Sequence, residues 1–178
     1  MRIIGGNKSG IRINIPKNLK LRPTTDRSKE ALFNILYNNY DFTKVSVLDL
    51  FGGSGNISYE FSSRGTEKIC LVEKNKKSID FIKSYSKTND FKIKVIKSDA
   101  FSFLKKEKMK YDIIFADPPY DLSISKYELI INTIFDNQML NINGSLIIEH
   151  FSKLSLHNSS NFSNSRKYGD TSFTFFHL

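Results

Sequence analysis

The chain has 178 residues, 39% of them hydrophobic and 25% charged, which is the composition of a single globular domain with its own core. Its apolar runs fall far short of the ~18 residues of a membrane-spanning helix, and the N-terminus lacks an apolar signal segment. One cysteine, Cys70, excludes an internal disulfide. A cytoplasmic protein is therefore expected, and the histidines show no metal-ligand spacing that would predict a metal site.

The formal net charge of +9 favours a polyanionic partner, and the cations gather near the N-terminus. Residues 1–30 hold eight cations and two acids. Lysine is frequent throughout the chain, so charge alone leaves nucleic-acid binding and a merely basic surface open. Arg22 and Arg27 could equally be surface or helix-capping cations. The candidate RNA contacts are Arg2, Arg12, Arg22, Thr24 and Arg27.

Residues 1–24 are predicted to form a small β-hairpin extension, because apolar and polar residues alternate in 2–4 and 11–15 around a glycine-rich turn. A helix is expected to begin near Thr25 or Asp26, where a capping side chain follows Pro23.

From residue 44 the pattern alternates between short apolar strands and amphipathic helices, which predicts a mostly parallel α/β sheet. Its end differs, because Gly169-Asp170 joins two strand-like segments in an antiparallel hairpin. The expected strands are 45–50, 68–72, 93–96, 112–116, 144–149, 164–168 and 171–176, and the expected helices are 56–63, 75–87, 100–106 and 125–135.

A glycine-rich turn follows the first of these strands. A dinucleotide fingerprint needs a third glycine where Ser58 stands, and Asp49 would repel a pyrophosphate. S-adenosyl-L-methionine carries no phosphate, and its ammonium and sulfonium groups are favoured by nearby acids. The turn thus predicts a site for S-adenosyl-L-methionine formed by Asp49, Phe51, Gly52, Gly53, Ser54 and Gly55.

Two further acids follow the next two strands. Glu73 lies 24 residues beyond Asp49, near the spacing of a carboxylate that accepts both ribose hydroxyls. Asp99 could accept from the adenine amino group, together with the main chain at Ala100. Each acid alone could be an ordinary turn residue, whereas the ordered set indicates a cofactor site.

The segment Asp117-Pro118-Pro119-Tyr120 follows the fourth strand and predicts methylation of an exocyclic base amine. The Asp117 carboxylate and the Pro118 carbonyl can accept hydrogen bonds from the amine, which frees its lone pair for attack. Tyr120 offers a face on which an extruded base can stack. Asp117 or water could take the departing proton.

These motifs closely resemble those of the bacterial small-subunit (16S) ribosomal RNA guanine-N2 methyltransferases, almost from end to end. Segments 2–6, 22–24, 30–36, 63–65 and 168–171 extend the resemblance. It implies a Rossmann-like methyltransferase with a seven-stranded, mostly parallel sheet and a C-terminal antiparallel hairpin, in which residues 25–178 form the catalytic core. It also implies one guanine of 16S rRNA in the small ribosomal subunit as the acceptor. The sequence leaves the oligomeric state open, and a monomer is the default expectation. Gly52 stands where the family usually has alanine, a departure expected to be harmless.

Two alternatives stay open. A DNA adenine-N6 or cytosine-N4 methyltransferase uses the same chemistry, although such enzymes usually carry a separate recognition region for which this chain has little room. A non-catalytic RNA-binding or assembly factor that retains the fold is the second, and it predicts no binding of S-adenosyl-L-methionine.

Overall fold

The computed structural model describes residues 1–16, 19 and 24–178. Helices and strands follow in the order α1 (Asp26–Tyr37), β1 (Ser46–Leu50), α2 (Asn56–Ser63), β2 (Lys68–Glu73), α3 (Lys76–Thr88), β3 (Lys94–Lys97), α4 (Ala100–Leu104), β4 (Tyr111–Ala116), α5 (Ile124–Asp136), β5 (Leu140–Phe151), β6 (Phe162–Tyr168) and β7 (Thr171–His177). Within these described ranges, no helix is both long and apolar enough to cross a membrane.

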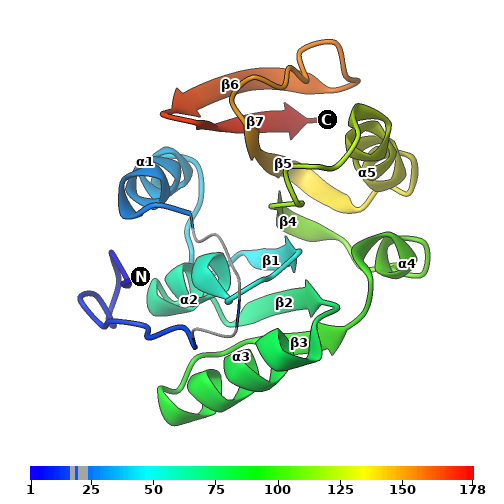
Figure 1. The fold of residues 1–178 in the computed structure, drawn as a ribbon. Coiled ribbons are helices and arrows are strands. Elements are labelled where there is room, and N and C mark those ends of the chain that lie inside the picture. The colour runs from blue at the N-terminus through cyan, green and yellow to red at the C-terminus, as the bar shows by residue number, and fades with distance from the viewer. Residues whose placement is uncertain (17–18, 20–23) are drawn as a thin grey trace.

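One seven-stranded sheet organises the molecule, with the strand order β3-β2-β1-β4-β5-β7-β6 (Figure 1). Strands β1 to β5 run parallel, whereas β7 is antiparallel to both of its neighbours. The predicted α/β sheet with a C-terminal antiparallel hairpin is confirmed. The strand order changes direction between β1 and β4, and open α/β sheets bind their ligands at the carboxyl ends of the strands beside such a switch point.

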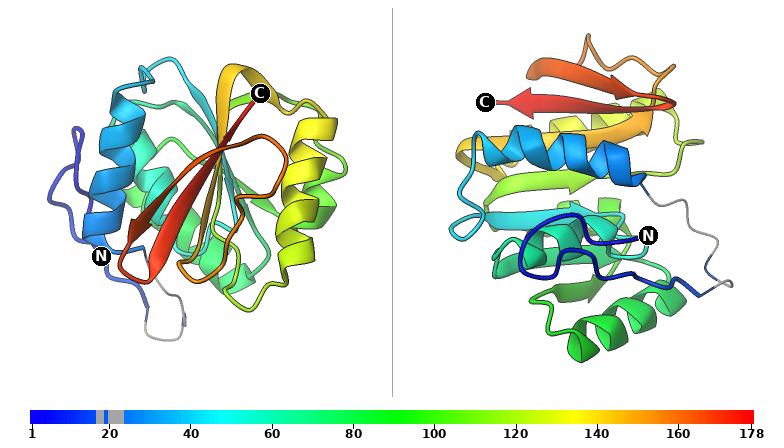
Figure 2. Two further views of the ribbon diagram at one scale, coloured as in Figure 1. Left: turned by 90° about the horizontal axis from the view of Figure 1, so that it is seen from above. Right: turned by 90° about the vertical axis from the view of Figure 1, so that its left-hand side faces the viewer.

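Helices cover both faces of the sheet, as the view from above in Figure 2 shows. Leu32 of α1 and Ile57 of α2 pack on one face against alternate strand residues such as Val47 and Phe115. Helices α4 and α5 cover the opposite face, where Ile130 is fully buried in a second apolar cluster. Because the inner strands β1 and β4 are buried on both faces, their sequences are almost continuously apolar.

The N-terminal arm (residues 1–13) forms part of the predicted hairpin. Its backbone pairs through an antiparallel bridge between Arg2 and Arg12. Ile3 and Ile13 are buried against α2 and α3, and the Ile4 N–H donates to the Glu60 carboxylate of α2 at 2.8 Å. The arm is therefore fixed on the body of the domain.

Strand β5 begins at Leu140, whereas the sequence predicted a start at Gly144. Its register on β4 jumps from Tyr111–Leu140 to Ile113–Ser145, so extra residues bulge out between the two pairs. Asn143 has a positive φ of 63°, and Ile142 is 89% exposed. This polar, irregular start lacks the apolar pattern of a buried strand, which is why the sequence reading missed it.

Candidate active site

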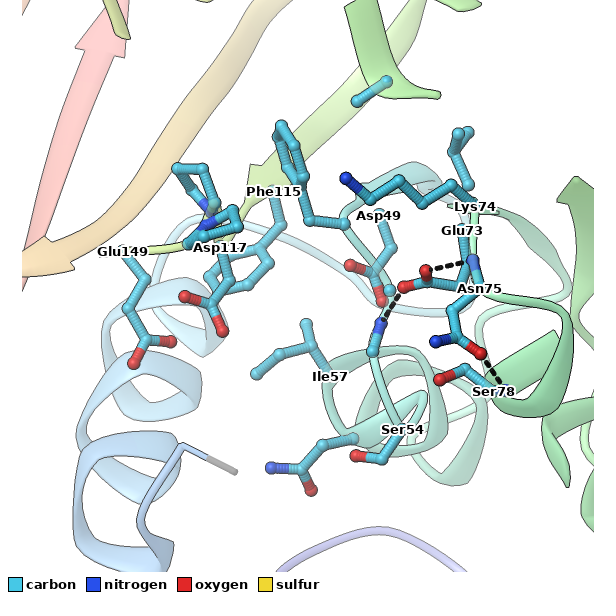
Figure 3. A pocket seen from close by; sticks show the side chains of 18 of the residues that line it. Asp49, Ser54, Ile57, Glu73, Lys74, Asn75, Ser78, Phe115, Asp117 and Glu149 are labelled. Carbon is cyan, nitrogen blue, oxygen red and sulfur yellow. Dashed lines mark hydrogen bonds between the residues drawn. The ribbon is translucent and has the colours of Figure 1, made fainter. Parts of the chain in front are cut away.

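A cavity of about 510 Å³ opens at the carboxyl ends of β1, β2, β4 and β5 (Figure 3). Its walls bring together the predicted cofactor and catalytic residues, which belong to segments far apart in the chain. Those that line it are Asp49, Phe51, Gly52, Gly53, Ser54, Glu73, Asp99, Ala100, Asp117, Pro118 and Tyr120. Gly55 follows Ser54 as the N-cap residue of α2 and is not among the residues that line the cavity.

The glycine-rich turn adopts a conformation that ordinary residues avoid. Gly53 and Gly55 have φ values of 56° and 83°, in the left-handed region where a side chain is costly. The Gly52 N–H donates to the Val72 carbonyl at 2.9 Å, and the Gly55 N–H donates to the Gly52 carbonyl at 2.7 Å. The turn is thereby tied to the neighbouring strand β2, with its backbone facing the cavity.

Gly52, which stands where the family usually has alanine, has a close neighbour that leaves no room for a side chain. A Cβ atom at position 52 would lie 2.4 Å from Cγ and Cδ2 of Leu71. Leu71 is fully buried, so its side chain has little space into which it can retreat. In this chain Gly52 and Leu71 therefore form a matched pair.

Asp49 lies beside the turn with its carboxyl group buried. Ser58 Oγ donates to Asp49 Oδ2 at 2.5 Å. Burial raises the pKa of Asp49 to about 7, while the hydrogen bonds from Ser58 lower it and the negative charge of Glu73 raises it further. A cationic ligand at this point would favour the ionised form of Asp49.

Glu73, at the end of β2, links the turn to the following segment. Its Oε2 accepts from the Gly53 N–H at 2.8 Å, and its Oε1 accepts from the Asn75 N–H at 2.7 Å (Figure 3). A carboxylate has about four acceptor positions, so these two bonds leave capacity for hydroxyl donors in the cavity. This arrangement fits the predicted ribose contact.

Asp99 has a structural role in addition to its place on the wall. Its Oδ1 accepts from the Ser102 N–H at 3.1 Å, which makes Asp99 the N-cap of α4. Nearby on the wall, Ser78 Oγ is buried and has no hydrogen-bond partner among the described residues. A buried hydroxyl without a partner fits a polar ligand such as S-adenosyl-L-methionine. No group of His, Cys, Asp and Glu that could hold a metal occurs in the described part of the chain.

The Asp-Pro-Pro-Tyr segment forms the wall beyond β4. The Asp117 N–H donates to the Leu50 carbonyl at 3.4 Å, which joins this segment to the strand that carries the glycine turn. The Tyr120 hydroxyl lies 2.9 Å from Thr171 Oγ1, and its ring packs on Phe151 at a centroid distance of 5.8 Å. These contacts hold the tyrosine at the cavity wall.

Glu149 is a cavity residue that the sequence reading missed. It lies near the end of β5, is 3% exposed and lines the cavity (Figure 3). Its Oε2 accepts from Thr24 Oγ1 at 2.7 Å. Thr24, predicted as an RNA contact, is thus buried in the wall and lies away from the exposed surface. The one available signal was a lone acid at the end of the predicted apolar strand 144–149.

The predicted RNA-contacting arginines have different surroundings. Arg2, Arg12 and Arg27 are exposed, and Arg2 Nε lies 2.8 Å from the Asp26 carboxylate. Arg22 lies outside the described residues. The arm that carries Arg2 and Arg12 reaches the cavity region, where Ser54 Oγ lies 3.5 Å from the sulfur of Met1.

Lys29, one of the eight N-terminal cations, is fully buried and cannot contact RNA. Its Nζ donates to Glu60 Oε1 at 3.0 Å and to Asn56 Oδ1 at 2.9 Å, both on α2. It also donates to the Arg2 carbonyl at 2.5 Å. Lys29 therefore joins the N-terminal arm, α1 and α2.

Known proteins are similar to this chain both in sequence and in fold. The family model described as conserved hypothetical protein 95 matches residues 1–177. The chain is 36% identical over 141 residues to the Ribosomal RNA small subunit methyltransferase D of Escherichia coli K12, covering 79% of this chain and 69% of that protein.

Two solved structures extend this comparison. The structure of a hypothetical protein of Thermus thermophilus superposes with a TM-score of 0.87 at 25% identity, over 100% of this chain and 99% of that one. A Thermus thermophilus 16S rRNA N2 G1207 methyltransferase, solved with AdoMet and guanosine, shares the fold with a TM-score of 0.69 at 20% identity. The superposition spans 86% of this chain and 43% of that protein. The resemblance read from the motifs is confirmed, and the chain belongs to the conserved hypothetical protein 95 family, together with the Ribosomal RNA small subunit methyltransferase D proteins.

Proposed function

We propose that this protein transfers the methyl group of S-adenosyl-L-methionine to the exocyclic N2 amine of a guanine in 16S rRNA of the small ribosomal subunit. The observation that carries the proposal is the shared cavity, in which the glycine turn with Asp49 and Glu73 meets Asp117 and Tyr120. The name of the E. coli relative supports ribosomal RNA as the substrate.

S-adenosyl-L-methionine is the methyl donor, and its sulfonium supplies an electrophilic methyl group. Glu73 accepts the ribose hydroxyls with the acceptor capacity that its two backbone hydrogen bonds leave. Asp49 contributes negative charge close to the cationic portion of the donor. The glycine turn allows the backbone to approach the ligand closely.

The acceptor amine lies between Asp117 and Pro118. Its N–H groups donate to the Asp117 carboxylate and the Pro118 carbonyl, so the nitrogen lone pair is free to attack the methyl carbon. With the donor bound, this attack would form the nitrogen–carbon bond as the carbon–sulfur bond breaks, and Asp117 or water would take the proton that the amine loses. Tyr120 provides a stacking face whose orientation is fixed by Thr171 and Phe151.

The exposed basic surface supports RNA as the class of substrate. Arg2, Arg12 and Arg27 supply exposed cations, and the arm that carries two of them reaches the cavity region. We assign RNA contact to the exposed cations of the extension formed by residues 1–24, and catalysis to the core formed by residues 25–178. The protein would act as a monomer in the cytoplasm, on the small-subunit particle.

Methyl transfer from radiolabelled S-adenosyl-L-methionine tests the proposal directly. The acceptors are small subunits, free 16S rRNA and duplex DNA, and the modified position is mapped in the labelled RNA. Labelled N2-methylguanine in the small subunit is the expected product. Label in DNA, or label at an adenine or a cytosine, would contradict the proposal, and failure to bind the cofactor in a calorimetric titration would leave only an RNA-binding role.

The RNA contacts are tested by salt dependence. Replacing Arg2 and Arg12 by glutamine should reduce the slope of log affinity against log salt by about one for each lost phosphate contact. Lys83→Gln, an exposed change on α3, is the matched control. Unchanged slopes in the arginine variants would remove the arm from the RNA interface.

A further inference from the structure

The Ser78 hydroxyl is a buried polar group on the cavity wall that the methyl-transfer argument does not use. Ser78 lies in the first turn of α3 and is fully buried. Its Oγ has no hydrogen-bond partner in the part of the chain that the structure describes. A buried hydroxyl that has lost its hydration without gaining a partner destabilises the free protein, and a bound ligand is one source of the missing partner.

The start of α3 places Ser78 on the same wall as Glu73. Asn75 is the N-cap of α3, and its Oδ1 accepts from the Ser78 N–H at 3.3 Å. The Asn75 N–H in turn donates to Glu73 Oε1 at 2.7 Å. All three residues line the cavity, and Figure 3 shows them together at its α3 side. A ligand group that Glu73 binds would therefore lie on the side of the cavity that Ser78 lines.

Glu73 and Ser78 offer complementary chemistry to a ribose. The ionised Glu73 carboxylate can only accept hydrogen bonds, whereas each ribose hydroxyl has one O–H donor and two acceptor lone pairs. When a ribose hydroxyl donates to Glu73, its oxygen can still accept a hydrogen bond, and a serine hydroxyl can supply it. Rotation about the single Cα–Cβ bond of Ser78 aims the hydroxyl without any movement of the backbone.

We infer that Ser78 is a further cofactor-binding residue, whose hydroxyl donates to a ribose hydroxyl oxygen of S-adenosyl-L-methionine while Glu73 accepts from the ribose. This inference rests on the cofactor site of the proposed function and adds a donor to its ribose subsite. Ser78 belongs to no motif, so only the structure brings it to the cavity.

Calorimetric titration with S-adenosyl-L-homocysteine, which lacks the methyl group but keeps the ribose, tests the assignment without any turnover. Ser78→Ala is expected to weaken binding about three- to tenfold, because one hydrogen bond to the ligand is lost. The titration is repeated with two analogues that lack the 2′- or the 3′-hydroxyl. The loss should disappear with the analogue that lacks the hydroxyl contacted by Ser78. Equal dissociation constants of variant and wild type, or the same loss with both analogues, would overturn the inference.

Ser86→Ala is the matched control. Ser86 is a buried serine eight residues further along α3, and it is not among the residues that line the cavity. This variant should bind S-adenosyl-L-homocysteine as the wild type does. A similar loss of affinity in both variants would point to a general loosening of α3 and would overturn the inference.

Thermal melting of the free protein separates a ligand contact from a structural one. Ser78→Ala removes a hydroxyl without a described partner, so the Tm of the free variant should equal or exceed that of the wild type. A Tm lower by several degrees, or a variant that does not fold, would show that the hydroxyl supports the fold and would overturn the inference.

The failure of this inference can be told from the failure of the proposed function. If the wild-type protein does not bind S-adenosyl-L-homocysteine at all, both are overturned. If the wild type binds it and Ser78→Ala binds it equally well, only the assignment of Ser78 fails.

Discussion

Lys29 offers the sharpest test of how the domain is held together. Lys29→Met keeps the length of this fully buried side chain but removes its charge and its three hydrogen bonds. Breaking a buried ion pair from one side costs about 3–5 kcal/mol, because the partner charge stays buried. Glu60 still accepts from Ile4 and from Arg64, so we expect the lower value, about 3 kcal/mol. For a domain of this size that loss lowers Tm by roughly 6–12 °C.

Urea unfolding monitored by circular dichroism measures the change, with Lys83→Met on the exposed face of α3 as the control. The double variant Lys29→Met with Glu60→Gln isolates the origin of the cost, because it also removes the stranded charge. Its loss should be smaller than the sum of the two single losses by at least about 1 kcal/mol. Additive losses, or a loss below about 1 kcal/mol for Lys29→Met alone, would refute the reasoning.

Four further changes probe the site. Asp117→Ala should reduce turnover at least about a hundredfold while cofactor affinity stays unchanged, as measured by single-turnover kinetics and calorimetry; near-normal turnover would remove its role in placing the amine. Glu73→Ala should weaken cofactor binding by roughly tenfold or more, because it removes both the ribose acceptor and the partner of two backbone N–H groups; equal dissociation constants would exclude it from the site. Because the pKa of Asp49 is raised from 3.8 to about 7, the native state holds this proton more tightly than the unfolded state. The stability that Asp49 contributes is therefore lost as pH rises from about 4 to about 7, and Asp49→Asn should flatten this part of the stability–pH curve; parallel curves would argue against the shift. Gly52→Ala should destabilise the fold by about 1–3 kcal/mol through overpacking, and Leu71→Ala should cost less in that background than alone; an unaltered Tm for Gly52→Ala would show that the leucine yields freely.

Periodicity and turn chemistry predicted the fold well, because most elements here are typical of their kind. The N-cap at Thr25 accepts from the Ser28 N–H, and Gly169 turns the final hairpin with a φ of 63°. Strand β5 was misjudged at its start because the register change around Asn143 depends on pairing with β4, which no local pattern reveals.

Site residues that belong to one continuous sequence motif could be predicted. Site residues that are brought together only by the tertiary fold could not. The glycine turn and the Asp-Pro-Pro-Tyr segment each form a continuous motif, and the cavity unites them. Glu149 belongs to no motif, since only the alignment of two parallel strands brings it beside Asp117. Lys29 had a readable signal: it precedes Leu32 and Phe33 by three and four residues, and so falls on the buried face of α1.

The link between Tyr120 and Thr171 makes the last strand indispensable for substrate handling. Strand β7 lies inside the sheet, between β5 and β6. A shortened chain that ends before β7 would therefore lose an interior strand together with Thr171, which holds the Tyr120 side chain. The cavity wall at Tyr120 thus depends on Thr171, which lies 51 positions downstream in the chain. Truncation that removes β7 should therefore abolish activity completely, whereas removal of an ordinary C-terminal tail would lower activity gradually.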